Sequence, residues 1–159
     1  MKLPDFPWDE LTPYAERAKQ HPGGLIDLSV GTPVDPTPQF IQEALRSAAN
    51  SPKYPLTAGT PELRAAIKDW AIRELGASGE FGVLPLIGSK ELVAWLPTLL
   101  QSKTLLYPEI AYPTYLVGGL IAQIKVTAVG FDAATWPSAE LAWINSPSNP
   151  TGRISSDQE

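Results

Sequence analysis

The stretch with the most chemical information, residues 145–152, reads NSPSNPTG. It follows the short apolar run 141–144, so we expect a loop at the carboxyl end of a buried strand, where open α/β sheets bind their ligands. Pro147 and Pro150 fix two backbone angles and remove two N–H donors, which makes the loop stiff. A stiff loop could hold the Asn149 amide in one direction, although an ordinary Pro/Asn turn has the same composition.

A second candidate is the turn Gly88, Ser89, Lys90, which lies between a predicted strand and a predicted helix. Glycine allows a close backbone approach, and the first free amides of a helix bind anions such as phosphate. The glycines are too few for the dinucleotide fingerprint and there is no Walker sequence, so the turn indicates an anion without naming a nucleotide. A glycine turn followed by a serine cap is the alternative interpretation.

Aromatic and glycine residues follow other predicted strand ends. Tyr112 lies beyond a strand end and could stack on a planar ligand, or could simply pack in the core. Tyr54 lies in a loop where its phenol could donate to an anion or serve a turn, and Gly31 could approach a ligand or make a turn. Taken together, a phosphate-binding turn, an aromatic ring and a directed amide suit a flat phosphorylated cofactor.

The elements that must position these residues follow from periodicity and breakers. Thr60 and Pro61 form the start of a capped helix that ends before Gly76. From residue 83 the alternation of strand and helix predicts an α/β fold with a mostly parallel sheet and helices on both faces. Pro85 argues that the strand containing it is irregular or at an edge. The predicted helices are 11–20, 38–50, 60–75, 89–100 and 112–121, and the predicted strands are 25–30, 83–87, 104–107, 124–129 and 141–145.

Composition excludes several classes of function. The chain has 159 residues, enough for a real core, and a net charge of -5, which disfavours nucleic acid or an anionic membrane as a partner. No apolar run approaches the roughly 20 residues that span a bilayer, and no secretory signal is present, so we expect a cytoplasmic protein. The absence of cysteine excludes thiolate chemistry. His21 is the only histidine and is expected in a loop, so no metal site is predicted.

With these motifs, the chain resembles the fold type I, pyridoxal phosphate (PLP) dependent aminotransferases of class I/II. The matching motifs run in the family's order and cover nearly the whole chain. Within the family, the opening stretch LPDFPWDELTPYAERAKQHPGGLIDLSVGTPVD is most similar to actinobacterial succinyldiaminopimelate aminotransferases. The motifs are LSVGTP at 28–33, KYPLTAGTPELRAAI at 53–67, GSKEL at 88–92, YPEIAYPTY at 107–115 and NSPSNPTG at 145–152.

The resemblance implies a role for each candidate. Gly88, Ser89 and Lys90 would hold the cofactor phosphate, largely through backbone amides. Tyr112 would stack on the pyridine ring and Asn149 would hydrogen-bond its phenolic oxygen, often across a cis bond to Pro150. In a homodimer, Tyr54 would reach the phosphate of the neighbouring subunit, and Gly31 would lie against the substrate carboxylate. Residues 1–35 would be an N-terminal arm and small-domain segment, and residues 36–159 the first part of the large PLP-binding domain.

The chain also departs from the family's pattern. The family places further residues after NSPSNPTG, among them the lysine that forms the Schiff base and arginines for the phosphate and the substrate carboxylate. Lys53, Lys90 and Lys125 do not occupy the Schiff-base motif, so no catalytic residue is assigned in this chain. We therefore expect an N-terminal portion of a longer enzyme that is inactive by itself.

The function implied for the parent enzyme is amino transfer from an amino acid, with glutamate the expected donor, to a keto acid. In lysine biosynthesis that keto acid would be N-succinyl-2-amino-6-oxopimelate. Two alternatives stay open from the sequence, because these motifs serve the cofactor and not one reaction: a fold type I carbon-sulfur β-lyase, and a non-catalytic binding fragment.

Overall fold

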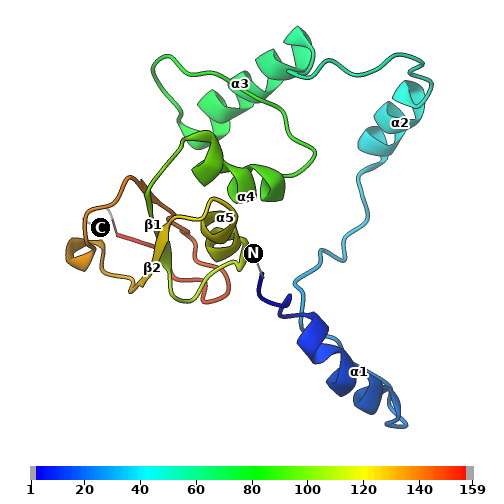
Figure 1. Ribbon diagram of the computed structural model, residues 1–159. Coiled ribbons are helices and arrows are strands. Elements are labelled where there is room, and N and C mark those ends of the chain that lie inside the picture. Colours follow the sequence, from blue (N-terminus) through cyan, green and yellow to red (C-terminus); the bar gives the residue numbers. More distant parts are fainter. Residues whose placement is uncertain (1–2, 157–159) are drawn as a thin grey trace. The chain divides into compact units, whose positions relative to one another are not determined.

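A computed structural model describes residues 3–156 of the chain (Figure 1). The chain divides into two compact units, which are described separately. The first unit combines Met1–Ser29 with Gly88–Glu159, and the second is Val30–Ile87. The predicted boundary at residue 35 refers to the domains of a whole enzyme and stays a prediction.

The first unit contains a three-stranded parallel sheet, as the strand-helix alternation predicts. Its strands are β1 (Thr104–Pro108), β2 (Lys125–Val129) and β3 (Leu141–Ala142), in the order β2-β1-β3. Leu105 of the central strand pairs with Val126 on one side and Leu141 on the other, and its side chain is fully buried. Because both neighbours run parallel to β1, all three carboxyl ends lie at one edge of the sheet.

Two helices connect and cover these strands. Helix α4 (Ser89–Leu99) precedes β1, and α5 (Thr114–Ile121) links β1 to β2 and packs against both of them and against α4 (Figure 1). Glycines allow this packing: a Cβ on Gly118 would lie 2.9 Å from the carbonyl oxygen of Val93, and one on Gly119 would lie 2.5 Å from Val126 Cγ2. The Gly-Gly pair therefore lets α5 approach both α4 and the sheet.

Shorter elements complete the first unit. The 3-10 turn η1 (Asp9–Leu11) leads into α1 (Thr12–Lys19), and a second turn, η2 (Ala133–Thr135), follows β2. The indole Nε1 of Trp8 donates to the carbonyl oxygen of Ser29 at 3.2 Å and so ties the start of the unit's first segment to its end. His21 lies in a loop as predicted, where its Nδ1 accepts from the N–H of Gly23 at 3.0 Å.

The second unit consists of α2 (Gln39–Ala48), α3 (Pro61–Leu75) and connecting loops. The predicted cap of α3 is confirmed, because Thr60 Oγ1 accepts from the N–H of Leu63 at 3.1 Å. Gly76 ends the helix with a left-handed backbone, φ 66°, as a glycine at that position should.

Two predicted strands are wrong and one is too long. Residues 25–30 and 83–87 form no strand, and β3 covers only two of the residues predicted at 141–145. A strand exists only when its N–H and C=O groups meet a partner, which apolar periodicity cannot guarantee. Pro85 removes one of those donors.

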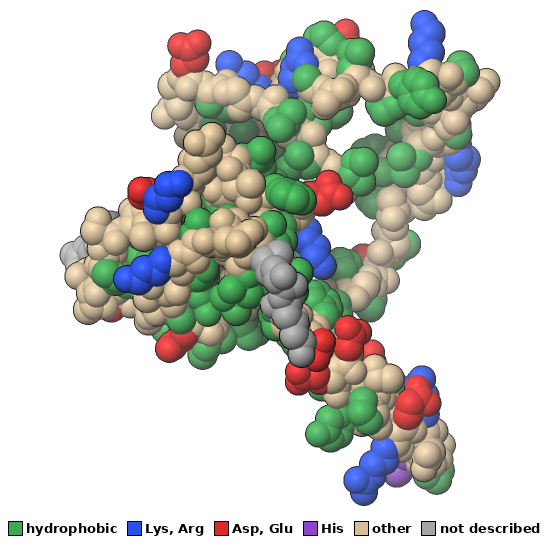
Figure 2. All heavy atoms as spheres, in the orientation of Figure 1, with side chains coloured by type: hydrophobic (Ala, Val, Ile, Leu, Met, Phe, Trp, Pro, Cys, Tyr) green, Lys and Arg blue, Asp and Glu red, His purple; other side chains and the backbone are tan. Residues whose placement is uncertain are grey.

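Many apolar side chains are exposed. None of the residues of α1, α2 and α3 is buried, and Phe40 and Leu45 of the amphipathic α2 are 71 % and 66 % exposed. Hydrophobic side chains are visible at the surface of α1 and α2 (Figure 2). Within residues 3–156, no helix is long and apolar enough to span a membrane.

Candidate functional site

The loop 145–152 is organised by Asn145. Its side-chain Oδ1 accepts from the backbone N–H of Asn149 at 2.8 Å, and its Nδ2 donates to the carbonyl oxygen of Pro147 at 3.0 Å. The bond between Asn149 and Pro150 is cis, as the resemblance implied, and the bond between Ser146 and Pro147 is cis as well. A side chain that bonds to the backbone at two points of a short loop restrains its shape.

The amide of Asn149 itself is available. The residue is exposed, and its side chain makes no hydrogen bond within the part of the chain that the structure describes. Two backbone hydrogen bonds close the second half of the loop. The N–H of Ser148 donates to the carbonyl oxygen of Arg153 at 2.7 Å, and the N–H of Gly152 donates to the carbonyl oxygen of Ser148 at 2.6 Å. A closed loop with a free amide can present that amide to a ligand.

The predicted anion turn is the N-terminus of α4. Gly88 is the N-cap residue and has no side chain to accept from the first-turn amides. A Cβ built on Gly88 would meet no atom within 4 Å, so the space beside it is open. The first amides of an α-helix have no intrahelical acceptor. Those of Ser89, Lys90 and Glu91 are therefore suited to an anion, where the helix dipole also favours negative charge.

Tyr112 belongs to a row of three aromatic rings. Its ring meets that of Tyr115 edge-on, with centroids 6.0 Å apart, and Tyr115 stacks on Trp143 at 5.0 Å and 14°. The backbone N–H of Trp143 donates to the carbonyl of Leu106 at 2.9 Å, which anchors the row to β1. Burial, and secondarily the neighbouring Tyr112, raises the pKa of Tyr115, so this phenol stays neutral at physiological pH.

The N-terminal segment contributes to the surroundings of Tyr112. A pocket of about 250 Å³ lies between residues 4–7 and a wall that includes Tyr107, Glu109 and Tyr112. Phe6 of this segment stacks on Trp8 at 4.8 Å and lies under the Lys90 ammonium, which is 4.5 Å from its ring centre. Phe6 thus contacts Lys90 and lines the same pocket as Tyr112.

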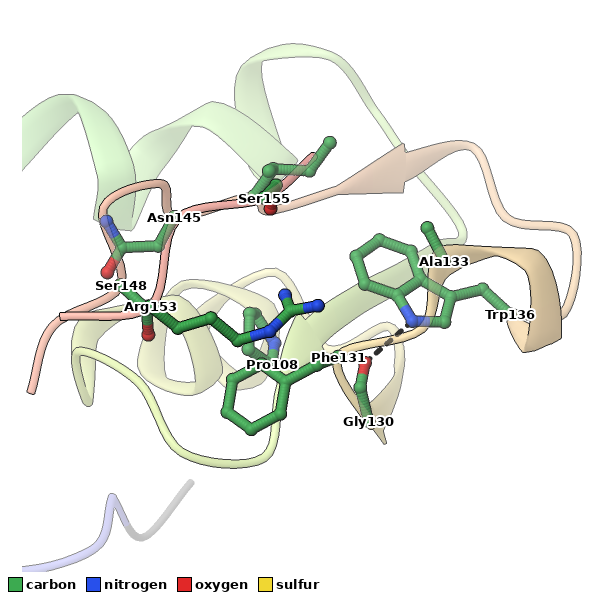
Figure 3. A pocket seen from close by; sticks show the side chains of 10 residues that line it. Pro108, Gly130, Phe131, Ala133, Trp136, Asn145, Ser148, Arg153 and Ser155 are labelled. Carbon is green, nitrogen blue, oxygen red and sulfur yellow. Dashed lines mark hydrogen bonds between the residues drawn. The ribbon is translucent and has the colours of Figure 1, made fainter. Parts of the chain in front are cut away.

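A second pocket, of about 110 Å³, opens at the carboxyl edge of the sheet (Figure 3). The Arg153 side chain extends toward Phe131, with its guanidinium 5.2 Å from the ring centre, and Trp136 Nε1 donates to the carbonyl of Gly130 at 2.8 Å. This pocket includes Asn145 and Ser148 of the loop but none of the predicted cofactor residues. We therefore keep the α4 turn, Tyr112 and Asn149 as the candidate cofactor groups, because the chemistry of each fits part of a ligand; among residues 3–156 no hydrogen bond or ring contact joins the three.

Two predicted residues lie in the second unit. Tyr54 is fully exposed, and a Cβ on Gly31 would meet nothing within 4 Å. Arg64 of α3 donates to the carbonyls of Ala58 and Gly59 at 3.2 and 3.1 Å, which fixes the end of the loop that carries Tyr54. The roles predicted for Tyr54 and Gly31 stay predictions.

Sequence reasoning missed Asn145 and Phe6. The signal for Asn145 was its position at the start of the loop, from which an Asx side chain can accept a hydrogen bond from the backbone of a following residue. Phe6 carried no such signal, because its contact with Lys90 joins residues more than eighty positions apart.

The first unit thus combines a parallel sheet, an uncapped helix N-terminus and a loop after β3 with a free amide, and comparison with known proteins gives its class. Residues 24–159 match the family model for aminotransferase class I and II. The chain belongs to this family, whose members depend on PLP.

Curated relatives include several named aminotransferases. The chain is 43 % identical over 164 residues to the 4-dedimethylamino-4-oxo-anhydrotetracycline transaminase OxyQ of Streptomyces rimosus, covering 99 % of this chain and 45 % of OxyQ. It is 49 % identical over 158 residues to "Probable aminotransferase Rv1178" of Mycobacterium tuberculosis, covering 96 % and 38 %. The LL-diaminopimelate aminotransferase of Desulforudis audaxviator is 36 % identical, with 84 % and 39 % covered. The chain thus spans less than half the length of these relatives.

Solved structures agree in fold. The aminotransferase AspB of Helicobacter pylori superposes with a TM-score of 0.78 at 27 % identity, covering 98 % of this chain and 46 % of AspB. The N-succinyldiaminopimelate aminotransferase of Mycobacterium tuberculosis gives a TM-score of 0.78 at 26 % identity, covering 96 % and 44 %. The predicted fold type I is therefore confirmed for the portion that this chain represents.

Proposed function

We propose that the whole protein is a PLP-dependent aminotransferase that moves an amino group between an amino acid and a keto acid. The observation that carries the proposal is that the first unit of a chain of this family contains both an uncapped helix N-terminus and a free, backbone-anchored amide. When bound, PLP supplies an electron sink for the substrate's α carbon.

The residues present fit this cofactor. The open space beside Gly88 and the first amides of α4 suit a doubly charged phosphate. The Tyr112 ring, held edge-on by Tyr115, offers a flat surface for a heteroaromatic ring. The free amide of Asn149 offers an N–H donor to a phenolic oxygen, and such a bond favours the ionised form of that oxygen. Each of these groups matches a different part of one molecule.

Two further roles are part of the proposal. The phenol hydroxyl of Tyr54 donates a hydrogen bond to the cofactor phosphate of a second subunit in a homodimer. The side chain is completely exposed in the single chain, which supports a contact outside its own subunit. Gly31 lies against the substrate carboxylate, where the absence of a side chain leaves room for a backbone contact. The protein acts in the cytoplasm.

For the substrate, we propose glutamate as the donor and N-succinyl-2-amino-6-oxopimelate as the acceptor, a step of lysine biosynthesis. Support comes from two kinds of relatives, an N-succinyldiaminopimelate aminotransferase among the solved structures and LL-diaminopimelate aminotransferases among the curated sequences. The chain is also 43 % identical to a 4-dedimethylamino-4-oxo-anhydrotetracycline transaminase. The test must therefore include a bulkier keto acid as an alternative acceptor.

The test uses the full-length gene product, purified with PLP and supplied with glutamate and one acceptor at a time. Formation of 2-oxoglutarate with the succinylated acceptor, at a higher kcat/KM than with unsuccinylated or polycyclic keto acids, is the expected result. Asn149→Ala serves as the matched variant and should lower the rate while the protein stays folded. Release of thiol and pyruvate from cystathionine in place of any amino transfer would overturn the proposal.

A further inference from the structure

Lys90 occupies a position that needs an electrostatic explanation. It lies in the first turn of α4, where the helix dipole is positive and a cation is disfavoured. Within residues 3–156, no carboxylate lies at ion-pair distance from its ammonium. The contact it does make is with the face of Phe6, 4.5 Å from the ring centre. Aromatic faces attract cations through their quadrupole, so Phe6 offsets part of the cost.

Phe6 is itself held in place. Its ring stacks on Trp8 at 4.8 Å and 30°, and Trp8 is fixed by the hydrogen bond from its Nε1 to the carbonyl of Ser29. The acceptor residue is held in turn, because both the N–H and the hydroxyl of Ser29 donate to Asp27 Oδ1, at 2.9 and 2.7 Å. A chain of short contacts thus runs from the 27–29 turn through Trp8 and Phe6 to Lys90.

We propose that Phe6 is a positioning residue for the phosphate end of the cofactor, acting through Lys90. The ring keeps the ammonium beside the first turn of α4, so that the positive charge and the backbone amides both attract a phosphate that binds there. Because Phe6 also lines the pocket that contains Tyr112, the N-terminal segment lies beside both the phosphate turn and the stacking ring. The inference rests on the proposed function and extends it to a residue outside the five cofactor-binding and substrate-binding motifs.

The experiment measures phosphate preference, the ratio of the dissociation constant of pyridoxal to that of PLP, in the cofactor-free full-length gene product. Phe6→Leu should lower this ratio by about two- to five-fold, the size expected for one exposed cation-π contact. Phe6→Tyr keeps an aromatic face and should leave the ratio unchanged. Phe6→Met keeps the apolar volume without the ring, and it gives the same measurement if Phe6→Leu fails to fold.

The Lys90→Gln background separates positioning from a structural role. There Phe6→Leu should have no further effect on the ratio, whereas Lys90→Arg, which keeps a charge that stacks on aromatic rings, should retain the dependence on Phe6. Equal weakening of PLP and pyridoxal by Phe6→Leu, or a lowered ratio that persists without Lys90, would overturn the inference. A parent protein that shows no phosphate preference at all would instead overturn the proposed function.

Discussion

The backbone N–H of Asn149 donates to the side-chain oxygen of Asn145 at 2.8 Å, so one asparagine anchors the other. The anchor uses the main chain of Asn149 and leaves its side-chain amide unpaired. Asn145 therefore restrains the backbone from which the Asn149 amide extends, although we assign it no contact with a ligand.

Asn145→Ala should weaken PLP binding at least about five-fold, because it removes two neutral hydrogen bonds of about 1 kcal/mol each and loosens the loop. It should also raise the pKa of the cofactor's phenolic group in the same direction as Asn149→Ala, but by less. An absorbance titration of both variants checks the order of the two shifts. A shift from Asn149→Ala with none from Asn145→Ala would show that the anchor is dispensable.

Tyr54→Phe should weaken PLP binding roughly ten-fold, since a donor to a charged phosphate is lost while the ring stays. If Tyr54 acts across a dimer, mixing Tyr54→Phe subunits with Asn149→Ala subunits should restore tight binding at one of the two sites in each mixed dimer. The two parent variants, each measured alone, are the controls. Two weakened sites in the mixed dimer, each with the affinity of its own parent variant, would place Tyr54 in its own subunit's site.

Gly118→Ala should destabilise the protein by about 1–3 kcal/mol, because its Cβ would lie 2.9 Å from the Val93 carbonyl oxygen and neither backbone can yield easily. Helix propensity alone favours alanine over glycine by about 1 kcal/mol, so a net loss isolates the clash with α4. Urea unfolding of the full-length protein measures it. Gly82→Ala, where a Cβ would meet nothing within 4 Å, should be close to neutral.

The Asp27 carboxyl should titrate below its ordinary pKa of 3.8, first because the Ser29 hydroxyl donates to it and second because the Ser29 N–H does. Since the pKa of the folded state is the lower one, the contribution of this turn is present above about pH 4 and is lost as pH falls through the folded pKa. Carboxyl chemical shifts in an NMR titration measure this. Ser29→Ala should move the pKa back toward 3.8, and an unchanged pKa would contradict the assignment.

The structure confirms those sequence predictions that depend on local chemistry. The cap at Thr60 and the glycine stop at Gly76 each follow from a few neighbouring residues, and the parallel pairing of β1 and β2 follows from the alternation of strand, helix and strand. The candidate site is likewise local in its parts, because the α4 turn and the 145–152 loop are each one continuous motif. These parts could be predicted without knowledge of the rest of the chain.

What could not be predicted depends on contacts between distant residues. The 83–87 run has the apolar character of a strand but finds no partner within the described residues, and the Phe6 contact with Lys90 follows from no spacing rule. The Asn145 anchor lies between these cases, because its residues are close in sequence while the bond depends on how the loop turns between them. The predictions were wrong where an element needed a distant partner, and not where the local propensity of the residues was misjudged.

The row of rings formed by Tyr112, Tyr115 and Trp143 also has an optical consequence. Tyrosine emission overlaps tryptophan absorption, so stacked rings with centroids 5.0 Å apart transfer excitation efficiently from Tyr115 to Trp143. A ligand that stacked on Tyr112 and absorbed near the tryptophan emission would quench Trp143 in turn. Trp143 is therefore a fluorescent reporter at the carboxyl edge of this sheet. Trp143→Phe would remove its emission and keep an aromatic ring stacked on Tyr115.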